Sequence, residues 1–175
     1  MINNQLEEYD YRFRNPNTIQ LYDNKRFAAE ISFQIKGNEL WITNLFRTEF
    51  ATAHGRPGRH YGTEIFAILL MHLFKNGESF DYILGRLAYH DAENGYWTGS
   101  IPYYARFVQY VPEVLGYNLK FYLFEDKDAM QAKKAVELPD YHDRETFRNF
   151  VEVFRQKHIH QCKDAYFCYV VERNC

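Results

Sequence analysis

Alternating apolar and polar positions from residue 26 onward predict a β-hairpin. Ile31, Phe33 and Ile35 share one face of the run "RFAAEISFQI", and the following run "ELWITNLF" alternates in the same way. The intervening "KGN" supplies the glycine that a tight turn favours. The pattern therefore predicts two strands joined at residues 36–38. Residues 1–25 are polar and aromatic and contain turn signals, and no secondary structure is firmly assigned to them.

Two later stretches carry apolar residues at helical spacing. From about Gly62 to Lys75 they form a broad stripe, and the residues before it, 48–60, are expected to form a loop. In "HDRETFRNFVEVFRQKH", Asp143 stands where an N-cap is expected. The apolar face of that second helix would hold Phe147, Phe150, Val151 and Phe154.

The remaining segments complete an alternation of strands and helices. Strands are predicted at "FDYILGRLAY", "LKFYLFE" and "DAYFCYVVE", and a helix at "IPYYARFVQYVPEVLGY" that is interrupted or ends near Pro112. "HDAENGYWTGS" is expected to be a turn-rich loop, and residues 127–139 a charged connection. The order β–β–α–β–α–β–α–β indicates one mixed α/β (α+β) domain over residues 1–175.

Length and composition narrow the class of protein. The chain has 175 residues, of which 46% are hydrophobic and 25% charged, which suits a globular domain with a sizeable core. A formal net charge of −2 argues against nucleic-acid binding, which needs a basic face. We recognise no signal peptide or membrane-spanning run, and three clustered cysteines fit a reducing compartment. A cytoplasmic protein with no membrane partner is expected.

A basic loop precedes the first predicted helix. "GRPGRH", residues 55–60, runs into "YGTEIFAILL". A helix N-terminus offers unpaired backbone N–H groups and a partial positive charge, which together bind phosphate. The stretch is therefore either a phosphate-binding loop or a solvated basic loop that leads into a core helix. Against the single acid Glu49, residues 47–60 carry the basic side chains Arg47, His54, Arg56, Arg59 and His60.

The helix half of this stretch resembles a known cofactor motif. The order of elements and "GTEIFAILL" resemble the GNAT family of N-acetyltransferases, whose signature is Gln/Arg-x-x-Gly-x-Gly/Ala, a small hydroxyl residue and a helix of spaced Leu and Ile. Gly62 falls on the final Gly/Ala and Thr63 on the hydroxyl position, while His60 replaces the first glycine and Pro57 the Gln/Arg. The resemblance implies a mixed, mostly antiparallel sheet flanked by helices, with residues 127–175 as a C-terminal helix–strand extension.

The same resemblance implies acetyl-CoA as cosubstrate and a small-molecule or peptide primary amine as acceptor. The backbone around residues 59–63 would hold the cofactor pyrophosphate, and the end of the second hairpin strand would lie along the pantetheine arm. Tyr104 in "PYYARF" matches the family's acid, which protonates the leaving thiolate, and Tyr110 is the second choice; Glu49 is the candidate base. The residues implied in cofactor binding are Leu45, Phe46, Arg47, Arg56, Arg59, His60, Tyr61, Gly62 and Thr63.

Other interpretations stay open at this point. A chain with this fold and a diverged cofactor loop would be a non-catalytic binding or regulatory protein, and a Cβ at His60 could narrow the space for the pyrophosphate. Family members often dimerise, so a homodimer is one possible assembly. In "HIHQC", His158, His160 and Cys162 stand two apart but match no common zinc motif, so no metal is expected.

Overall fold

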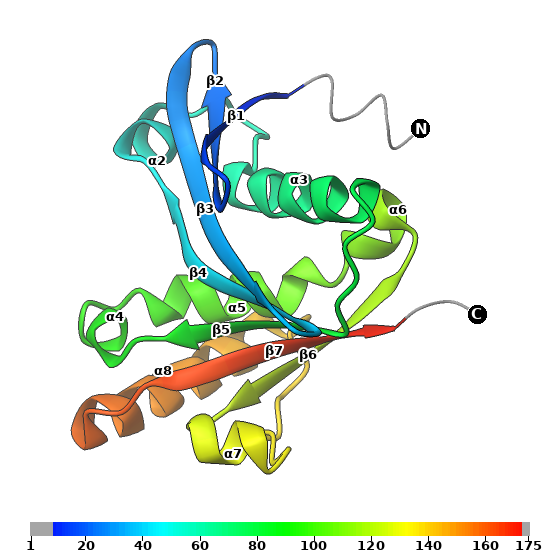
Figure 1. Cartoon of the computed structure of the whole chain (residues 1–175). Coiled ribbons are helices and arrows are strands. Elements are labelled where there is room, and N and C mark those ends of the chain that lie inside the picture. The colour runs from blue at the N-terminus through cyan, green and yellow to red at the C-terminus, as the bar shows by residue number, and fades with distance from the viewer. Residues whose placement is uncertain (1–8, 173–175) are drawn as a thin grey trace. The chain divides into compact units, whose positions relative to one another are not determined.

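The computed structural model describes residues 9–172, which belong to two compact units (Figure 1). The first unit holds the described residues up to Asp81 together with Glu113–Gly116, and the second holds Tyr82–Pro112 and those from Tyr117 onward. The strand pairings within each unit are antiparallel, and helices pack against the strands. The expected class, a mixed α/β fold with a mostly antiparallel sheet flanked by helices, is confirmed.

Four strands of the first unit pair consecutively and antiparallel. They are β1 (Asp10–Asn15), β2 (Thr18–Asp23), β3 (Arg26–Lys36) and β4 (Glu39–Arg47). Tight turns with left-handed backbone join the last three: Asn24 and Lys25 have φ of 48° and 65°, and Gly37 has φ of 61°. Asparagine and glycine adopt this conformation more readily than most residues. The predicted hairpin around "KGN" is therefore confirmed.

A β-bulge interrupts the pairing of β4 with β3. Ser32 pairs with Asn44 and Phe33 with Ile42, so Thr43 is the additional residue on β4. A bulge increases the local twist and bends its strand, and bulges are frequent next to active sites. This one lies where β4 passes from alternating buried side chains to a more exposed C-terminal end.

The helix α3 (Tyr61–Lys75) supplies much of the core of the first unit. It packs against β2, β3 and β4, and each large apolar side chain that it buries contributes about 1.5–3 kcal/mol. The helix predicted from about Gly62 to Lys75 is thus confirmed. Its fully buried side chains include Ile65, Phe66, Ile68, Leu69 and Leu70.

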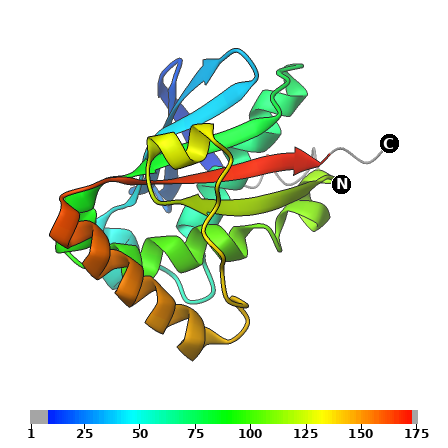
Figure 2. The same cartoon turned by 90° about the horizontal axis from the view of Figure 1, so that it is seen from below.

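Three strands of the second unit lie in the order β5–β7–β6. β5 spans Tyr82–Leu87, β6 spans Asn118–Phe124, and β7 spans Ala165–Glu172, so the last strand of the chain lies between the other two. The helices α5 (Trp97–Phe107) and α8 (Arg144–Gln161) pack against each other, as Figure 2 shows in green and orange. The three predicted strands are confirmed.

The start of α8 is the one that the sequence predicts. The Asp143 side chain accepts a hydrogen bond from the Thr146 backbone N–H at 3.2 Å. This bond satisfies one of the N–H groups that a helix start leaves unpaired. The predicted apolar stripe is buried or partly buried, and it consists of Phe147, Phe150, Val151 and Phe154.

Several short elements lie where the sequence predicted loops or assigned nothing. β1 and β2 occupy part of the unassigned N-terminal stretch, and α2 (Glu49–His54) lies inside the predicted loop 48–60. α7 (Lys127–Gln131) begins the charged connection. α2 and α7 are too short to show a periodic stripe, which is why the sequence pattern missed them. The helix predicted at residues 101–117, with an interruption or end near Pro112, is present as the later part of α5 and as α6 (Val111–Leu115), which carries its proline in the first turn, where proline is tolerated.

The loop prediction for "HDAENGYWTGS" was wrong. α4 (Tyr89–Glu93) and the first turn of α5 occupy this stretch. The Trp97 ring is fully buried, and its indole N–H donates to the Ala88 carbonyl at 3.1 Å. Tertiary packing of this ring therefore overrides the local preference of glycine and asparagine for turns.

A close stack of residues joins β5, β7 and α5 in the second unit. Gly85 pairs with Phe167 across the strands, and a Cβ at Gly85 would lie only 2.3 Å from the Phe167 Cε1 atom. The Tyr104 ring stacks on the same phenyl ring with centroids 4.1 Å apart. The missing side chain at Gly85 therefore leaves the space that Phe167 fills, and Phe167 supports Tyr104.

Gly85→Ala is expected to lower the free energy of unfolding by about 1–3 kcal/mol, because the added methyl group overlaps the Phe167 ring. Urea unfolding measures the change. Gly99→Ala is the matched control: nothing lies within 4 Å of a Cβ there, and alanine favours the helix. Unchanged stability in Gly85→Ala, or an equal loss in both variants, would contradict this packing.

Candidate functional site

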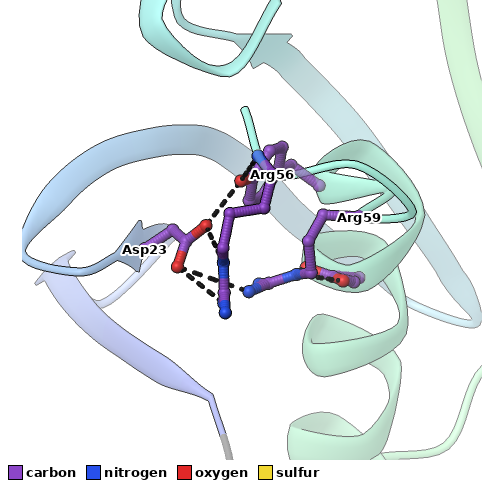
Figure 3. Close-up of polar contacts among 5 residues, drawn as sticks. Asp23, Arg56 and Arg59 are labelled. Atoms are coloured by element: carbon purple, nitrogen blue, oxygen red, sulfur yellow. Dashed lines mark hydrogen bonds and ion pairs between the residues drawn. The ribbon is translucent and has the colours of Figure 1, made fainter. Parts of the chain in front are cut away.

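The basic loop of the first unit is folded around a buried carboxylate, that of Asp23 (Figure 3). Asp23 ends β2, and only 3% of its side chain is exposed. Tyr61 donates its hydroxyl hydrogen to Asp23 Oδ2 at 2.6 Å. Arg56 donates from Nε to the same oxygen at 2.8 Å, and its Nη2 lies 2.7 Å from Oδ1. Arg59 adds a longer ion pair, with Nη1 3.5 Å from Oδ1, so one carboxylate holds both arginines of the loop.

Glu64, in the first turn of α3, is the closer partner of Arg59. Nε and Nη2 of Arg59 donate to the two carboxylate oxygens at 2.7 Å each, which is the bidentate geometry typical of arginine and carboxylate. The guanidinium also lies over the Tyr61 ring, 4.9 Å from its centroid. Since only 20% of the Arg59 side chain is exposed, water screens this pair less than it screens a surface pair.

Tyr61 connects the loop to the start of α3. Its hydroxyl group donates to Asp23 and accepts a hydrogen bond from the Arg56 backbone N–H at 3.0 Å. Gly55 approaches the same side chain so closely that a Cβ there would lie 2.7 Å from the Tyr61 Cε2 atom. The loop is therefore closed onto the first residue of the helix.

The charges of this cluster compensate one another. The hydrogen bond from Arg56 is the main cause that holds the pKa of Asp23 below its usual range, while burial acts in the opposite direction. Hydrogen bonds to the two carboxylates raise the pKa of Arg56 and of Arg59. Asp23 and both arginines are therefore ionised at neutral pH, and the formal charges of Asp23, Glu64, Arg56 and Arg59 sum to zero.

The N-terminus of α3 has no side-chain cap. His60 occupies the N-cap position with φ of −119°, and its exposed side chain makes no capping hydrogen bond. Gly58, with φ of 81°, turns the loop two residues earlier. First-turn N–H groups of a helix have no intrahelical partner and carry a partial positive charge. Gly62 and Thr63, two of the residues expected to hold a phosphate, lie within this first turn.

Other expected site residues lie at the end of β4 and the start of α2. Leu45 is half-buried, whereas Phe46 and Arg47 are exposed. Thr48 caps α2 by accepting a hydrogen bond on its side chain. Glu49, the candidate base, is the exposed first residue of that helix. These residues share the first unit with the cluster around Asp23.

Tyr104, the candidate acid, lies in α5 of the second unit. Its ring is 9% exposed and stacks on Phe167, and its backbone carbonyl accepts a hydrogen bond from the Tyr169 hydroxyl at 2.6 Å. Burial, with a smaller contribution from Asp91, raises the pKa of the Tyr104 phenol. The phenol therefore keeps its proton across the neutral range. Tyr110, the second choice, is 45% exposed and follows the end of α5.

The residues of "HIHQC" do not converge on one point. His158 is buried, and its ring nitrogens lie 2.8 and 2.9 Å from the carbonyl oxygens of Phe154 and Glu125, whereas His160 and Cys162 are exposed. Within residues 9–172, no group of three or more His, Cys, Asp or Glu side chains is arranged to hold a metal ion. His158 thus joins α8 to the segment that follows β6.

Sequence reasoning missed the acids that organise the loop. Asp23 stands in "YDNK", which the pattern marked only as a turn, and its partner Arg56 lies 33 residues further along the chain. Glu64 was not predicted as a partner of Arg59, because it stands in the apolar helix motif "GTEIFAILL". Asp23 stands directly before a tight turn, which places it at the end of a strand. No local sequence pattern predicts which side chains bind it.

Comparisons with known proteins do not assign the chain to a family. No protein-family model and no curated protein sequence matches it. Among solved structures, a Bacillus subtilis acetyltransferase in complex with CoA is similar, at 12% sequence identity and a TM-score of 0.43. That similarity covers 99% of this chain and 82% of the other. None of the helices between residues 9 and 172 combines the length and apolar character that crossing a bilayer requires.

Asp23→Asn is expected to lower the free energy of unfolding by about 2 kcal/mol at neutral pH. Removing one partner of a fully buried pair costs more, about 3–5 kcal/mol, but 56% of the Arg56 side chain is exposed and stays hydrated. Asp10→Asn is the control, since that side chain is 49% exposed and its nearest ion pair, to Arg12, is 3.8 Å long. Urea unfolding should show a change below about 0.5 kcal/mol for the control.

The effect of Asp23→Asn should depend on pH. The folded-state pKa of Asp23 is below its unfolded value of about 4, so its stabilisation is fully present above that value. It is lost as the pH falls through the folded-state pKa, and the difference between parent and variant should shrink there. A difference that stays constant into this acidic range would contradict the role of the ionised carboxylate.

Proposed function

We propose that this chain binds acyl-CoA at the start of α3 and transfers the acetyl group of acetyl-CoA to a primary amine. The observation that carries the proposal is the match of "GTEIFAILL" to the cofactor helix of the GNAT family, located at a helix start without a side-chain cap. The aligned peptide dipoles of this 15-residue helix equal about half a positive charge at that end. A pyrophosphate is therefore favoured there.

The acid pairs determine how the pyrophosphate would be held. Arg56 and Arg59 already bind carboxylates, so a phosphate gains their attraction only by displacing one of those contacts. Arg56 is the freer of the two, because its side chain is 56% exposed against 20% for Arg59. Arg59 already donates its backbone N–H to the Arg56 carbonyl at 3.2 Å. Backbone N–H groups at the start of α3 would therefore supply most of the affinity, the Arg56 side chain would add to it, and Arg59 would keep the loop in shape.

The thioester would lie along the exposed end of β4, beyond the bulge. Leu45 and Phe46 offer apolar surface to the pantetheine arm, and Glu49 would take a proton from the ammonium form of the acceptor, directly or through water. The neutral amine then attacks the acetyl carbonyl carbon, the new C–N bond forms, and the C–S bond breaks to release the thiolate. The proton lost by the amine balances the one that the thiolate gains.

Tyr104 is proposed to stabilise the leaving thiolate. An ordinary phenol has a pKa of about 10 and a thiol about 8.5, so complete proton transfer to a free thiolate is uphill by about 2 kcal/mol. Burial raises the pKa of this phenol and makes the transfer harder still. The main contribution would therefore be a hydrogen bond to the developing negative charge on sulfur.

Acetyl-CoA at about a hundred times its dissociation constant should stabilise the protein by about 2.7 kcal/mol, which thermal unfolding detects. Desulfo-CoA retains the pyrophosphate and should act similarly, whereas pantetheine lacks it and should act weakly. Thr63→Glu places a carboxylate in the first turn of α3 and should remove the shift by repelling the phosphates. Gln34→Glu adds the same charge at an exposed site in β3 and is the control. No shift with millimolar acetyl-CoA would refute the proposal.

Tyr104→Phe is expected to lower kcat for release of CoA thiol, assayed with a panel of primary amines, by about 100-fold. The KM for acetyl-CoA should change little. The variant keeps the ring that stacks on Phe167 and removes only the hydroxyl group, so the fold should be retained. Tyr96→Phe, at a side chain of 64% exposure, is the control. Unchanged turnover in Tyr104→Phe would remove this residue from the mechanism, and cofactor binding without any turnover would favour the non-catalytic alternative.

A further inference from the structure

A hollow of about 390 Å³ lies between α5 and α8, entirely within the second unit. Its volume falls in the range of small-molecule sites. Three arginines line it: Arg106 comes from α5, and Arg144 and Arg148 come from the first turns of α8. Figure 2 shows the two helices that form its walls. One acid, Glu145, also lines the hollow, so the lining side chains carry a net formal charge of +2.

These three arginines differ from those arginines of the chain that are bound to an acid. Arg59 lies 2.7 Å from the carboxylate of Glu64, and Arg155 lies 2.6 Å from that of Glu152. Within the described residues, by contrast, Arg106, Arg144 and Arg148 form no ion pair. Glu152, one turn beyond Arg148 on α8, is occupied by Arg155 and Gln156.

The positions of the arginines bring like charges together. Arg144 and Arg148 are four residues apart on one helix, a spacing at which like charges repel and destabilise the helix slightly. Asp143, the nearest further acid on α8, is engaged in capping through Thr146. Asp143 and Glu152 are engaged elsewhere, and Glu145 is a single acid beside three arginines. The repulsion and the remaining positive charge favour an external anion as a further partner.

The walls of the hollow also suit an organic group. Gly99 leaves open space, since nothing lies within 4 Å of a Cβ at that position, and the aliphatic stems of the arginines offer apolar surface beside it. Guanidinium groups bind phosphate oxygens in bidentate fashion. A phosphate monoester carries close to two negative charges at neutral pH, which equals the excess charge of the lining.

We infer that this hollow binds a small organic phosphate monoester, with Arg106, Arg144 and Arg148 around the phosphate and the open space at Gly99 beside the organic group. The site is separate from the loop proposed for acyl-CoA and does not depend on that proposal. The phosphate loses one charge as the pH falls below about 6, so binding should weaken there. Added salt should weaken it as well, since exposed charges are screened.

The test uses phenyl phosphate as the probe and the whole chain, with backbone amide NMR as the readout. Saturable shifts are expected at Thr98, Gly99 and Arg144. Arg144→Gln/Arg148→Gln alters two exposed side chains and should weaken binding at least about tenfold, equivalent to about 1.4 kcal/mol. Lys133→Gln/Lys134→Gln removes the same charge from exposed positions outside the hollow and should leave the affinity unchanged.

Further arms separate the sources of a phosphate. Inorganic phosphate should bind more weakly than phenyl phosphate, because it makes no apolar contact with the walls of the hollow. Absence of saturable shifts, equal losses in the arginine and lysine variants, or binding of a phosphoserine peptide but no small phosphate would overturn the inference. Dephospho-acetyl-CoA keeps the pyrophosphate but lacks the phosphate monoester that acetyl-CoA carries on its ribose. Its stabilisation of the protein should be the same in Arg144→Gln/Arg148→Gln as in the parent, so failure of one proposal can be told from failure of the other.

Discussion

A buried carboxylate organises the loop in which the proposed cofactor site lies. Asp23 is 3% exposed, and an ionised group taken out of water costs several kcal/mol unless other groups compensate it. The compensation comes from Arg56, Arg59 and the Tyr61 hydroxyl, all of which lie in the loop or at the start of α3. The conformation of residues 55–61 therefore follows from the need to neutralise one side chain at the end of β2.

The same compensation limits what the basic loop can do for an anion. In the sequence, Arg56 and Arg59 stand in a basic stretch, but in the structure each is bound to an acid, and the cluster with Glu64 is neutral. In the proposed cofactor site, the main attraction for a phosphate would therefore be the helix start, which has no side-chain cap. The arginines between α5 and α8 present the opposite case, because the lining carries a net positive charge and, among residues 9–172, these arginines form no ion pair.

Elements that are long enough to show a regular spacing of apolar residues were predictable from the sequence. The β3–β4 hairpin, α3 and α8 each bury a regular apolar face, and the Asp143 cap of α8 follows from residue type and spacing alone. α2, α4 and α7 have only five or six residues, and a single turn or two shows no period. β1 was missed because most of its side chains are exposed and mix aromatic with charged residues.

The sequence by itself determined the class of fold, the helix that begins at Tyr61 and the residue types of the candidate site, because such features depend on neighbours within a few positions. Only the tertiary structure decided which acids neutralise which arginines. Asp23 meets Arg56 across 33 residues and Tyr61 across 38, and Gly85 meets Phe167 through strand pairing. Contacts of this kind have no local signature, since chain segments distant in sequence become neighbours only when strands pair and helices pack.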